Sequence, residues 1–152
     1  MIGGVLVVCV GNLCRSPMAE GLLRRAMPGM KVTSAGIQAR AGMSADPYAV
    51  SVMLSHHIDI SGHRSQPLSG ALCAGHDVMF VMDEPLKQHV LNRYPQLRGR
   101  VHLLDREGIA DPYRQPHDVF VNCYERIAAA VDAWQPRLSA LLGASARDMS
   151  SP

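Results

Sequence analysis

The segment that most constrains this chain is residues 9–17, which read Cys-Val-Gly-Asn-Leu-Cys-Arg-Ser-Pro. An apolar, β-branched run at 5–8 precedes it, which is typical of a fully buried strand. Ser16 followed by Pro17 indicates a helix start, with the serine as N-cap and the proline at the first helical position. We therefore predict a strand-to-helix loop whose N–H groups, together with the helix N-terminus, converge on an anion.

Cys9 and Arg15 stand six positions apart in this loop, and the arginine adds a planar fork that matches two phosphate oxygens. Helix N-termini and adjacent cations favour the thiolate form of cysteine, so we expect Cys9 to attack phosphorus in line and form a phosphocysteine. The pattern alone is weak, because a cysteine at the end of an apolar strand is more often part of the core. Gly11, Asn12 and Ser16 favour the nucleophile interpretation.

Length and composition are typical of one domain, since 152 residues at 47% hydrophobic content can bury a single core. A formal net charge of +2 is too small to indicate a nucleic-acid partner. The four cysteines include no Cys-x2-Cys pair, so we expect reduced thiols and no metal in a cytoplasmic protein. No export signal and no apolar run of about 20 residues is present, so membrane insertion is not expected.

Strand and helix patterns alternate along the chain. The strand candidates are residues 5–8, 31–34, 77–82 and 101–104, and the helix candidates are residues 17–27, 46–56, 68–74 and 84–94. This alternation predicts an α/β fold with a parallel sheet, helices on both faces, and a site at the carboxyl ends of the strands.

The C-terminal part of the chain carries an amphipathic helical stripe from Phe120 to Leu141, interrupted by Pro136. Packing of this helix against the sheet is favoured over a coiled coil, because the stripe is short. Residues 144–152 are expected to be a disordered tail, which leaves residues 1–143 as a single domain.

The segment 8–20 closely resembles the signature of the low-molecular-weight protein tyrosine phosphatases. The resemblance covers nearly the whole chain and continues in the family's order at Ser34-Ala35-Gly36, His63, Val81-Met82-Asp83-Glu84 and Asp111-Pro112-Tyr113-Arg114. The runs from Val8 and from Ile109 are most similar to the bacterial branch that acts beside autophosphorylating tyrosine kinases of capsule and exopolysaccharide export. The family resemblance implies a four-stranded parallel sheet of flavodoxin-like order.

The same resemblance implies roles for individual residues. Cys9 would be the nucleophile, Arg15 the phosphate clamp, and Asp111 the acid that protonates the leaving tyrosyl oxygen and then activates water. The remaining members of the phosphate-binding loop would be Val10, Gly11, Asn12, Leu13, Cys14 and Ser16. Taken alone, Asp111 is more typical of a turn residue before proline.

The resemblance also implies that Ser34 and His63 support the loop, although a lone histidine is more often a surface or satisfied core residue. Asn12 suits a left-handed backbone position, which would aim the N–H groups of the loop inward. Ser16 has two possible roles, as a helix cap or as a donor to Cys9, and the family pattern favours the second.

Leu13, Tyr113 and Arg40 map to the rim that would receive the phenyl ring. Many relatives carry isoleucine in place of Leu13, and some carry an aromatic where Arg40 stands, so substrate preference is expected to differ. Cys14 either forms a protective disulfide with Cys9, as the resemblance implies, or packs behind the loop. The other two cysteines, Cys73 and Cys123, are expected to be buried small hydrophobes.

The resemblance implies a phosphotyrosine protein as partner, in particular an autophosphorylating tyrosine kinase, with the enzyme acting as a monomer and without a cofactor. One alternative is a thiol-coupled arsenate reductase, which would need two further cysteines on a mobile segment. Cys73 and Cys123 lie fifty residues apart, which argues against that chemistry. Another alternative is a phosphotyrosine-binding module without turnover, which intact Cys9, Arg15 and Asp111 disfavour.

Overall fold

The computed structural model describes the backbone of residues 3–150 and the side chains of residues 3–141. Its centre is a four-stranded sheet in the order β2-β1-β3-β4, in which every pairing is parallel. The strands are β1 (Val5–Cys9), β2 (Val32–Gly36), β3 (Val78–Val81) and β4 (Val101–Leu103). The sheet confirms the predicted α/β fold and its flavodoxin-like strand order.

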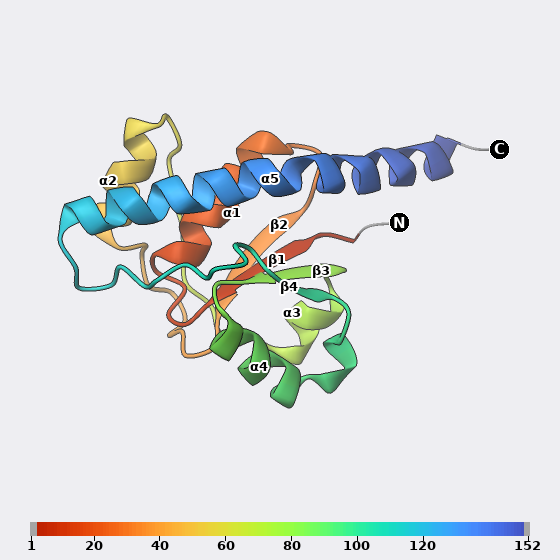
Figure 1. The fold of residues 1–152 in the computed structure, drawn as a ribbon, viewed down its shortest axis with the longest axis horizontal. Helices are drawn as coiled ribbons and strands as arrows, with labels where there is room; N and C mark the ends of the chain where they lie inside the picture. Colours follow the sequence, from red (N-terminus) through yellow and green to blue (C-terminus); the bar gives the residue numbers. More distant parts are fainter. Residues whose placement is uncertain (1–2, 151–152) are drawn as a thin grey trace.

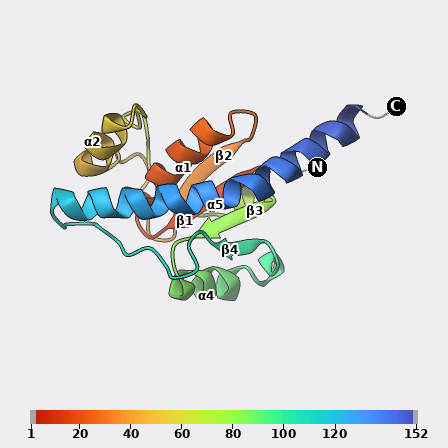
Figure 2. The same cartoon turned by 45° about the horizontal axis from the view of Figure 1, so that its top comes forward.

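Helices cover both faces of the sheet (Figures 1 and 2). They are α1 (Arg15–Ala26), α2 (Pro47–Ser55), α3 (Gly70–Ala74), α4 (Glu84–Arg93) and α5 (His117–Ser150), with a 3-10 turn η1 (Pro95–Leu97) after α4. Helices α1 and α5 lie on one face and α3 and α4 on the other, while α2 packs beside α5. No helix within the described residues combines the length and the hydropathy needed to cross a bilayer.

Strand β1 is the buried centre of the sheet, because it pairs with β2 on one side and β3 on the other. Its last residue, Cys9, stands in register with Gly36 of β2. A Cβ at Gly36 would lie 2.5 Å from the carbonyl oxygen of Val10. Glycine is therefore needed here for the loop after β1 to approach the end of β2.

The start of α1 differs from the sequence prediction. The helix begins at Arg15, with Cys14 at the N-cap position and no side-chain cap, whereas the sequence indicated Ser16 as the cap. Ser16 lies inside the first turn and is fully buried, with its hydroxyl bonded to residues of the preceding loop. The N-cap prediction for Ser16 was therefore wrong, because the hydroxyl has partners other than the helix N–H groups.

Helix α5 also extends further than the sequence indicated. It passes through Pro136 without a break, and its backbone continues to Ser150, where a disordered tail over 144–152 was expected. Adding residues to an established helix costs little, and alanine and leucine, which recur in 139–145, are good helix formers. The last two residues of that tail, 151–152, lie outside the described part of the chain.

Candidate active site

A pocket of ≈450 Å³ opens at the carboxyl end of β1, where the chain turns through residues 10–14 into α1. In open parallel sheets this edge is where ligands bind, because the strand order reverses there. The pocket brings together segments far apart in the sequence. It is lined by Cys9, Val10, Gly11, Leu13, Cys14, Arg15, Gln38, Arg40, Met43, Asp111, Tyr113 and Arg114.

The thiol of Cys9 lies at the bottom of this pocket, and the residue is 2% exposed. Its Sγ accepts a hydrogen bond from the backbone N–H of Asn12 at 3.2 Å. The hydroxyl of Ser16 lies 2.9 Å from the same sulfur and accepts from the side-chain amide of Asn12; it donates to the sulfur when Cys9 is a thiolate, which has no proton to give. Both bonds stabilise negative charge on the sulfur.

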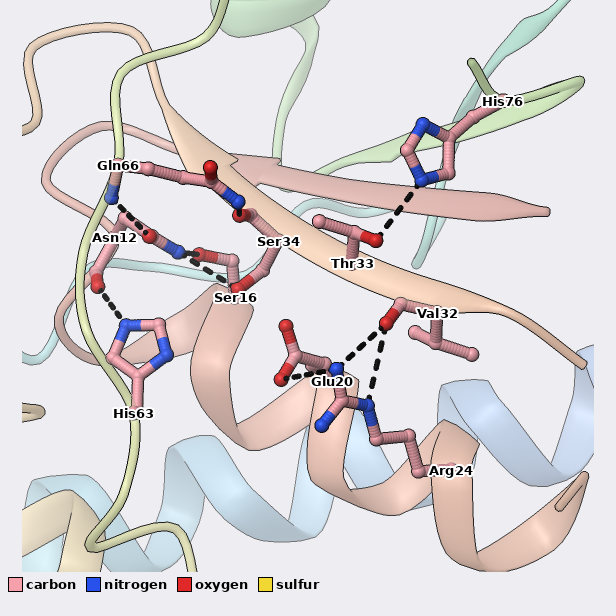
Figure 3. Close-up of polar contacts among 10 residues, drawn as sticks. All are labelled: Asn12, Ser16, Glu20, Arg24, Val32, Thr33, Ser34, His63, Gln66 and His76. Carbon is pink, nitrogen blue, oxygen red and sulfur yellow. Dashed lines mark hydrogen bonds and ion pairs between the residues drawn. The ribbon is translucent and has the colours of Figure 1, made fainter. Parts of the chain in front are cut away.

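Asn12 holds the loop from behind (Figure 3). Its φ of 58° confirms the predicted left-handed conformation. Its side-chain amide donates to Ser16 Oγ at 2.8 Å and Ser34 Oγ at 3.0 Å, and Oδ1 accepts from the backbone N–H of Gln66 at 3.0 Å. The backbone carbonyl of Asn12 lies 2.7 Å from His63 Nε2. Each of these polar groups therefore has a partner, in a residue that is 0% exposed.

Gln66 contributes to this network although sequence reasoning gave it no role. Its backbone N–H binds Asn12, and its side-chain Nε2 donates to the carbonyl of Ser34 at 3.0 Å. The contact with Asn12 is made through the main chain and leaves no pattern in the sequence, and the side-chain contact with Ser34 depends on the fold, so no signal pointed to Gln66.

Arg15 is 3% exposed and is surrounded by polar groups from two other segments. Its Nη1 donates to the carbonyl of Ile109 at 2.8 Å and lies 3.7 Å from Asp83 Oδ2, while Nη2 lies 3.7 Å from Asp111 Oδ2. Two carboxylates thus compensate a buried charge, which would otherwise be costly. Arg15 Nε is buried and has no hydrogen-bond partner among the described residues, so it can donate to a bound oxyanion.

Asp83 was quoted only as part of the family pattern and was given no site role. Its Oδ1 accepts from the N–H of Leu86 and caps α4 at 2.9 Å, and its other oxygen faces Arg15. The cap is visible in the sequence as an acidic residue before Glu84 and a proline, whereas the contact with Arg15 depends on the fold.

Asp111 lies in the loop that follows β4, about a hundred positions from Cys9 in the sequence, and lines the same pocket. Its Oδ1 accepts from the N–H of Tyr113 at 3.1 Å, which is the turn geometry expected of an aspartate before a proline. Its Oδ2 faces Arg15, and the side chain is 45% exposed. Asp111 is therefore both a turn residue and a lining residue of the pocket.

The three residues expected at the substrate rim, Leu13, Arg40 and Tyr113, all line the pocket. Two further rim residues were not expected, namely Met43 and Arg114. The guanidinium of Arg114 stands 5.3 Å from the centre of the Tyr113 ring, a cation–π distance. The rim thus combines apolar side chains with two exposed guanidinium groups.

All four cysteines are free and buried, which agrees with the expected packing of Cys73 and Cys123. Burial, with a smaller contribution from the Asp46 carboxylate, raises the pKa of Cys14 far above its usual range. Burial also raises the pKa of Cys123 to about 12, although the Arg15 charge opposes this shift. These thiols therefore stay protonated near neutral pH. Within the described residues, no group of three His, Cys, Asp or Glu side chains is placed to hold a metal ion.

A buried thiol that accepts from a loop N–H, beside a buried arginine at the carboxyl edge of a doubly wound parallel sheet, is typical of enzymes that bind phosphoryl groups. The family model described as "Low molecular weight phosphotyrosine protein phosphatase" matches residues 4–143. The chain therefore belongs to the low-molecular-weight phosphotyrosine protein phosphatases.

Individual relatives agree with this assignment. The chain is 50% identical over 144 residues to the probable low-molecular-weight protein-tyrosine-phosphatase EpsP of Ralstonia nicotianae, covering 93% of this chain and 99% of the relative. The crystal structure of the tyrosine phosphatase Wzb from Escherichia coli K30 in complex with sulphate superposes with a TM-score of 0.87 at 34% identity, covering 91% and 99% of the two chains.

The arginine phosphatase YwlE from Geobacillus stearothermophilus shares the fold as well, with a TM-score of 0.85 at 29% identity and coverage of 90% and 92%. EpsP and Wzb are named as tyrosine phosphatases and YwlE as an arginine phosphatase, so the fold alone is common to two substrate classes.

Proposed function

We propose that the protein hydrolyses phosphotyrosine through a phosphocysteine intermediate, and that its substrate is an autophosphorylating tyrosine kinase of exopolysaccharide or capsule synthesis. One observation carries the mechanism: the hydrogen-bonded thiol of Cys9 shares a single pocket with the guanidinium of Arg15 and the carboxylate of Asp111. Nucleophile, charge clamp and acid are thus within reach of one phosphate group.

In the first step the Cys9 sulfur attacks phosphorus and forms the S–P bond. The bond from phosphorus to the tyrosyl oxygen breaks, its electron pair stays on that oxygen, and protonated Asp111 supplies the proton. A phenolic oxygen has a solution pKa near ~10 and is a poor leaving group without this proton. In the second step water attacks the phosphocysteine, Asp111 accepts a proton from it, and phosphate leaves with the thiolate restored.

Arg15 would neutralise the charge on the transferring phosphoryl group. Its Nε has no partner among the described residues, and its Nη2 is held only by a 3.7 Å contact with Asp111. These two nitrogens form the fork that matches two phosphate oxygens. The loop from Val10 to Cys14 would supply backbone donors for the remaining oxygens.

Tyrosine is favoured over arginine as the phosphorylated residue by the rim of the pocket. Leu13, Met43 and Tyr113 supply apolar surface for a phenyl ring. The guanidinium groups of Arg40 and Arg114 would repel the guanidinium part of a phosphoarginine, which a phosphotyrosine lacks. They would instead attract acidic or phosphorylated residues beside the target tyrosine, as a multiply phosphorylated kinase tail provides.

Peroxide would convert Cys9 to a sulfenic acid, and attack by the Cys14 sulfur would then form a disulfide and release water. The raised pKa of Cys14 keeps it a thiol in the reduced enzyme, so Cys9 is the site of the first oxidation. Because turnover needs a reduced Cys9, we place the enzyme in a reducing compartment, the cytoplasm. We propose that the enzyme acts as a monomer, and that it needs no cofactor because Arg15 and the loop N–H groups would carry the charge that compensates the phosphate.

An arsenate reductase would pass a disulfide from Cys9 to further cysteines. Cys73 lies on α3 and Cys123 on α5, which cover opposite faces of the sheet (Figure 1). The sheet separates them, so this placement does not support a relay.

The direct test is turnover of phosphotyrosine peptides and of phosphoarginine, followed by acid quenching and mass spectrometry of the protein. We expect phosphotyrosine turnover and a phosphate adduct on the Cys9 peptide. Absence of turnover with retained binding would instead identify a phosphotyrosine-binding module. Loss of phosphotyrosine from a purified polysaccharide-export kinase, with no loss from a control phosphoprotein, would test the proposed substrate.

A further inference from the structure

A second cavity lies behind the catalytic loop. This rear pocket has a volume of ≈720 Å³ and is lined among others by Glu20, Arg24, Arg25, His57, His63 and Arg64. It has no lining residue in common with the active-site pocket and is the larger of the two. Its volume falls in the range of pockets that bind small molecules.

The rear pocket is lined by three arginines and by two carboxylates, Glu20 and Asp59, so its positive charge is only partly compensated. Arg24 pairs with Glu20 at 3.5 Å. Arg25 donates through Nη1 to the carbonyl of His56 at 2.7 Å, and Arg64 donates through Nη1 to the carbonyl of His63 at 2.7 Å. Within the described residues neither Arg25 nor Arg64 forms an ion pair, and neither Nη2 makes a hydrogen bond. Two guanidinium groups therefore retain donors for an anion.

Part of the lining of the same pocket, which we call its floor, is apolar. It consists of Pro17, Ile58 and Ile60, and the two isoleucines are 8% and 7% exposed. A bare inorganic ion would leave this surface uncovered. A phosphorylated metabolite with an organic body would use both the floor and the guanidinium groups.

One wall residue connects the rear pocket to the catalytic loop (Figure 3). His63 Nε2 lies 2.7 Å from the carbonyl oxygen of Asn12, and the N–H of Asn12 donates to Cys9 Sγ at 3.2 Å. Gln66 also lines the pocket and binds the side chain of Asn12. A ligand that moves His63 or Gln66 therefore acts on the residue that orients the N–H group above the sulfur.

We propose that the rear pocket binds a small phosphorylated metabolite and that this binding changes turnover at Cys9 through His63 and Asn12. The proposed change in turnover rests on the proposed function, whereas metabolite binding to the rear pocket does not. Coupling between two sites changes affinity or rate by about fivefold or more in typical cases, and the binding effects are reciprocal.

The binding test is calorimetry on the full chain with the active site filled by benzylphosphonate, a non-hydrolysable analogue of phosphotyrosine. The probes are inorganic phosphate, glucose 6-phosphate and adenosine diphosphate, which separate a free phosphate from a sugar or nucleotide body. We expect one of the organic phosphates to bind at one site per chain, about tenfold or more weaker in Arg25→Ala and Arg64→Ala. Arg98→Ala, an exposed arginine outside both pockets, is the matched control.

Either of two results would overturn binding: no heat with any organic phosphate at about 1 mM, or equal affinity in all three arginine variants. Tighter binding of inorganic phosphate than of either organic probe would overturn the assignment of a metabolite. These outcomes do not depend on catalysis. If the enzyme does not turn over phosphotyrosine even when no probe is present, that result would instead contradict the proposed function.

The regulatory test measures phosphotyrosine turnover at saturating substrate with and without the probe that binds. We expect kcat to change by about fivefold or more, and the ratio to approach one in His63→Ala, in which the arginines remain but the contact with Asn12 is lost. A change in KM alone would indicate competition at the active site and would refute the coupling. An unchanged ratio in His63→Ala would exclude His63 as the connection.

Discussion

The two sides of the loop from Val10 to Cys14 use their polar groups in opposite ways. On the pocket side, the Cys9 thiol faces a cavity and Arg15 Nε has no partner among the described residues. On the rear side, the carbonyl, the amide nitrogen and the amide oxygen of Asn12 are all hydrogen-bonded. The open groups can hold an oxyanion without reorganisation because the saturated side keeps the loop in place.

The largest effect is expected from removing the nucleophile on the pocket side. Cys9→Ser should lower kcat by about three orders of magnitude or more, while Arg15 and the loop donors still bind phosphotyrosine. Stopped assays and calorimetry with a phosphotyrosine peptide measure the two properties separately. Residual hydrolysis within about tenfold of the parent enzyme would contradict a covalent step through Cys9.

The second variant removes the proposed acid and keeps the shape of the side chain. Asp111→Asn should slow hydrolysis of phosphotyrosine by about 10²–10⁴-fold, because the phenolic oxygen then leaves without a proton. An aryl phosphate with a more acidic phenol, such as p-nitrophenyl phosphate, should be slowed much less. Equal slowing of the two substrates would exclude Asp111 as the acid.

The rear side is tested by Asn12→Ala, with Asn12→Gly as the matched control. Alanine loses the side-chain bonds to Ser34 and Gln66 and is strained at a φ of 58°, so we expect the free energy of unfolding to fall by about 2–4 kcal/mol. Asn12→Gly loses the same bonds without backbone strain, so its free energy of unfolding should fall by about 1 kcal/mol less than that of Asn12→Ala.

If the rear side keeps the loop in place for catalysis, Asn12→Ala should lower kcat by about 10²-fold as well as lowering stability. Urea denaturation and kinetics on the same samples measure both quantities. Unchanged kcat in a destabilised variant would show that the rear network stabilises the fold without positioning the loop.

The sequence predicted the sheet well and the ends of two helices poorly. The apolar run at 5–8 identifies β1, because a strand buried on both faces of a parallel sheet has a continuous hydrophobic sequence whichever strands it pairs with. Ser16 was mistaken for a cap because its real partners, the Cys9 sulfur and the Asn12 amide, become neighbours only when the loop closes. The end of α5 was missed because a nucleated helix continues through sequences that would not start one.

The site residues also differ in how far the sequence could predict them. Its loop members are contiguous, so their spacing was visible, and family resemblance added Asp111, Ser34 and His63 from other segments. Two hydrogen bonds could not be predicted from the sequence: the one from Arg15 to the carbonyl of Ile109 and the one from the N–H of Gln66 to Asn12. Both use main-chain groups, which nearly every residue has.

A smaller effect concerns the buried thiols beside the pocket. The pKa of Cys123 is raised to about 12 in the folded protein, above that of an unfolded cysteine. Below about pH 9 both states keep the proton, whereas above it the unfolded chain ionises first, so stability falls as pH rises, by up to about 1.4 kcal/mol per pH unit. Cys14, also raised by burial, adds to this slope.

Urea denaturation between about pH 8 and about pH 10 measures the slope, and Cys123→Ala should be flatter than the parent over that range. Lysines and tyrosines titrate in both proteins and cancel in the difference. Parallel slopes would show that Cys123 is as accessible to solvent when folded as when unfolded.

The smallest effect is expected at the rim, where exposed Arg40 faces solvent above the pocket. Arg40→Ala should lower kcat/KM by about two- to fivefold for a phosphotyrosine peptide with acidic neighbours, because exposed ion pairs contribute little and are screened by salt. A peptide with neutral neighbours should be unaffected, and Arg98→Ala should alter neither. Equal losses on both peptides would mean that Arg40 shapes the pocket itself. Arg40 would then contribute to phosphate binding on the pocket side of the loop and not to the choice between peptides.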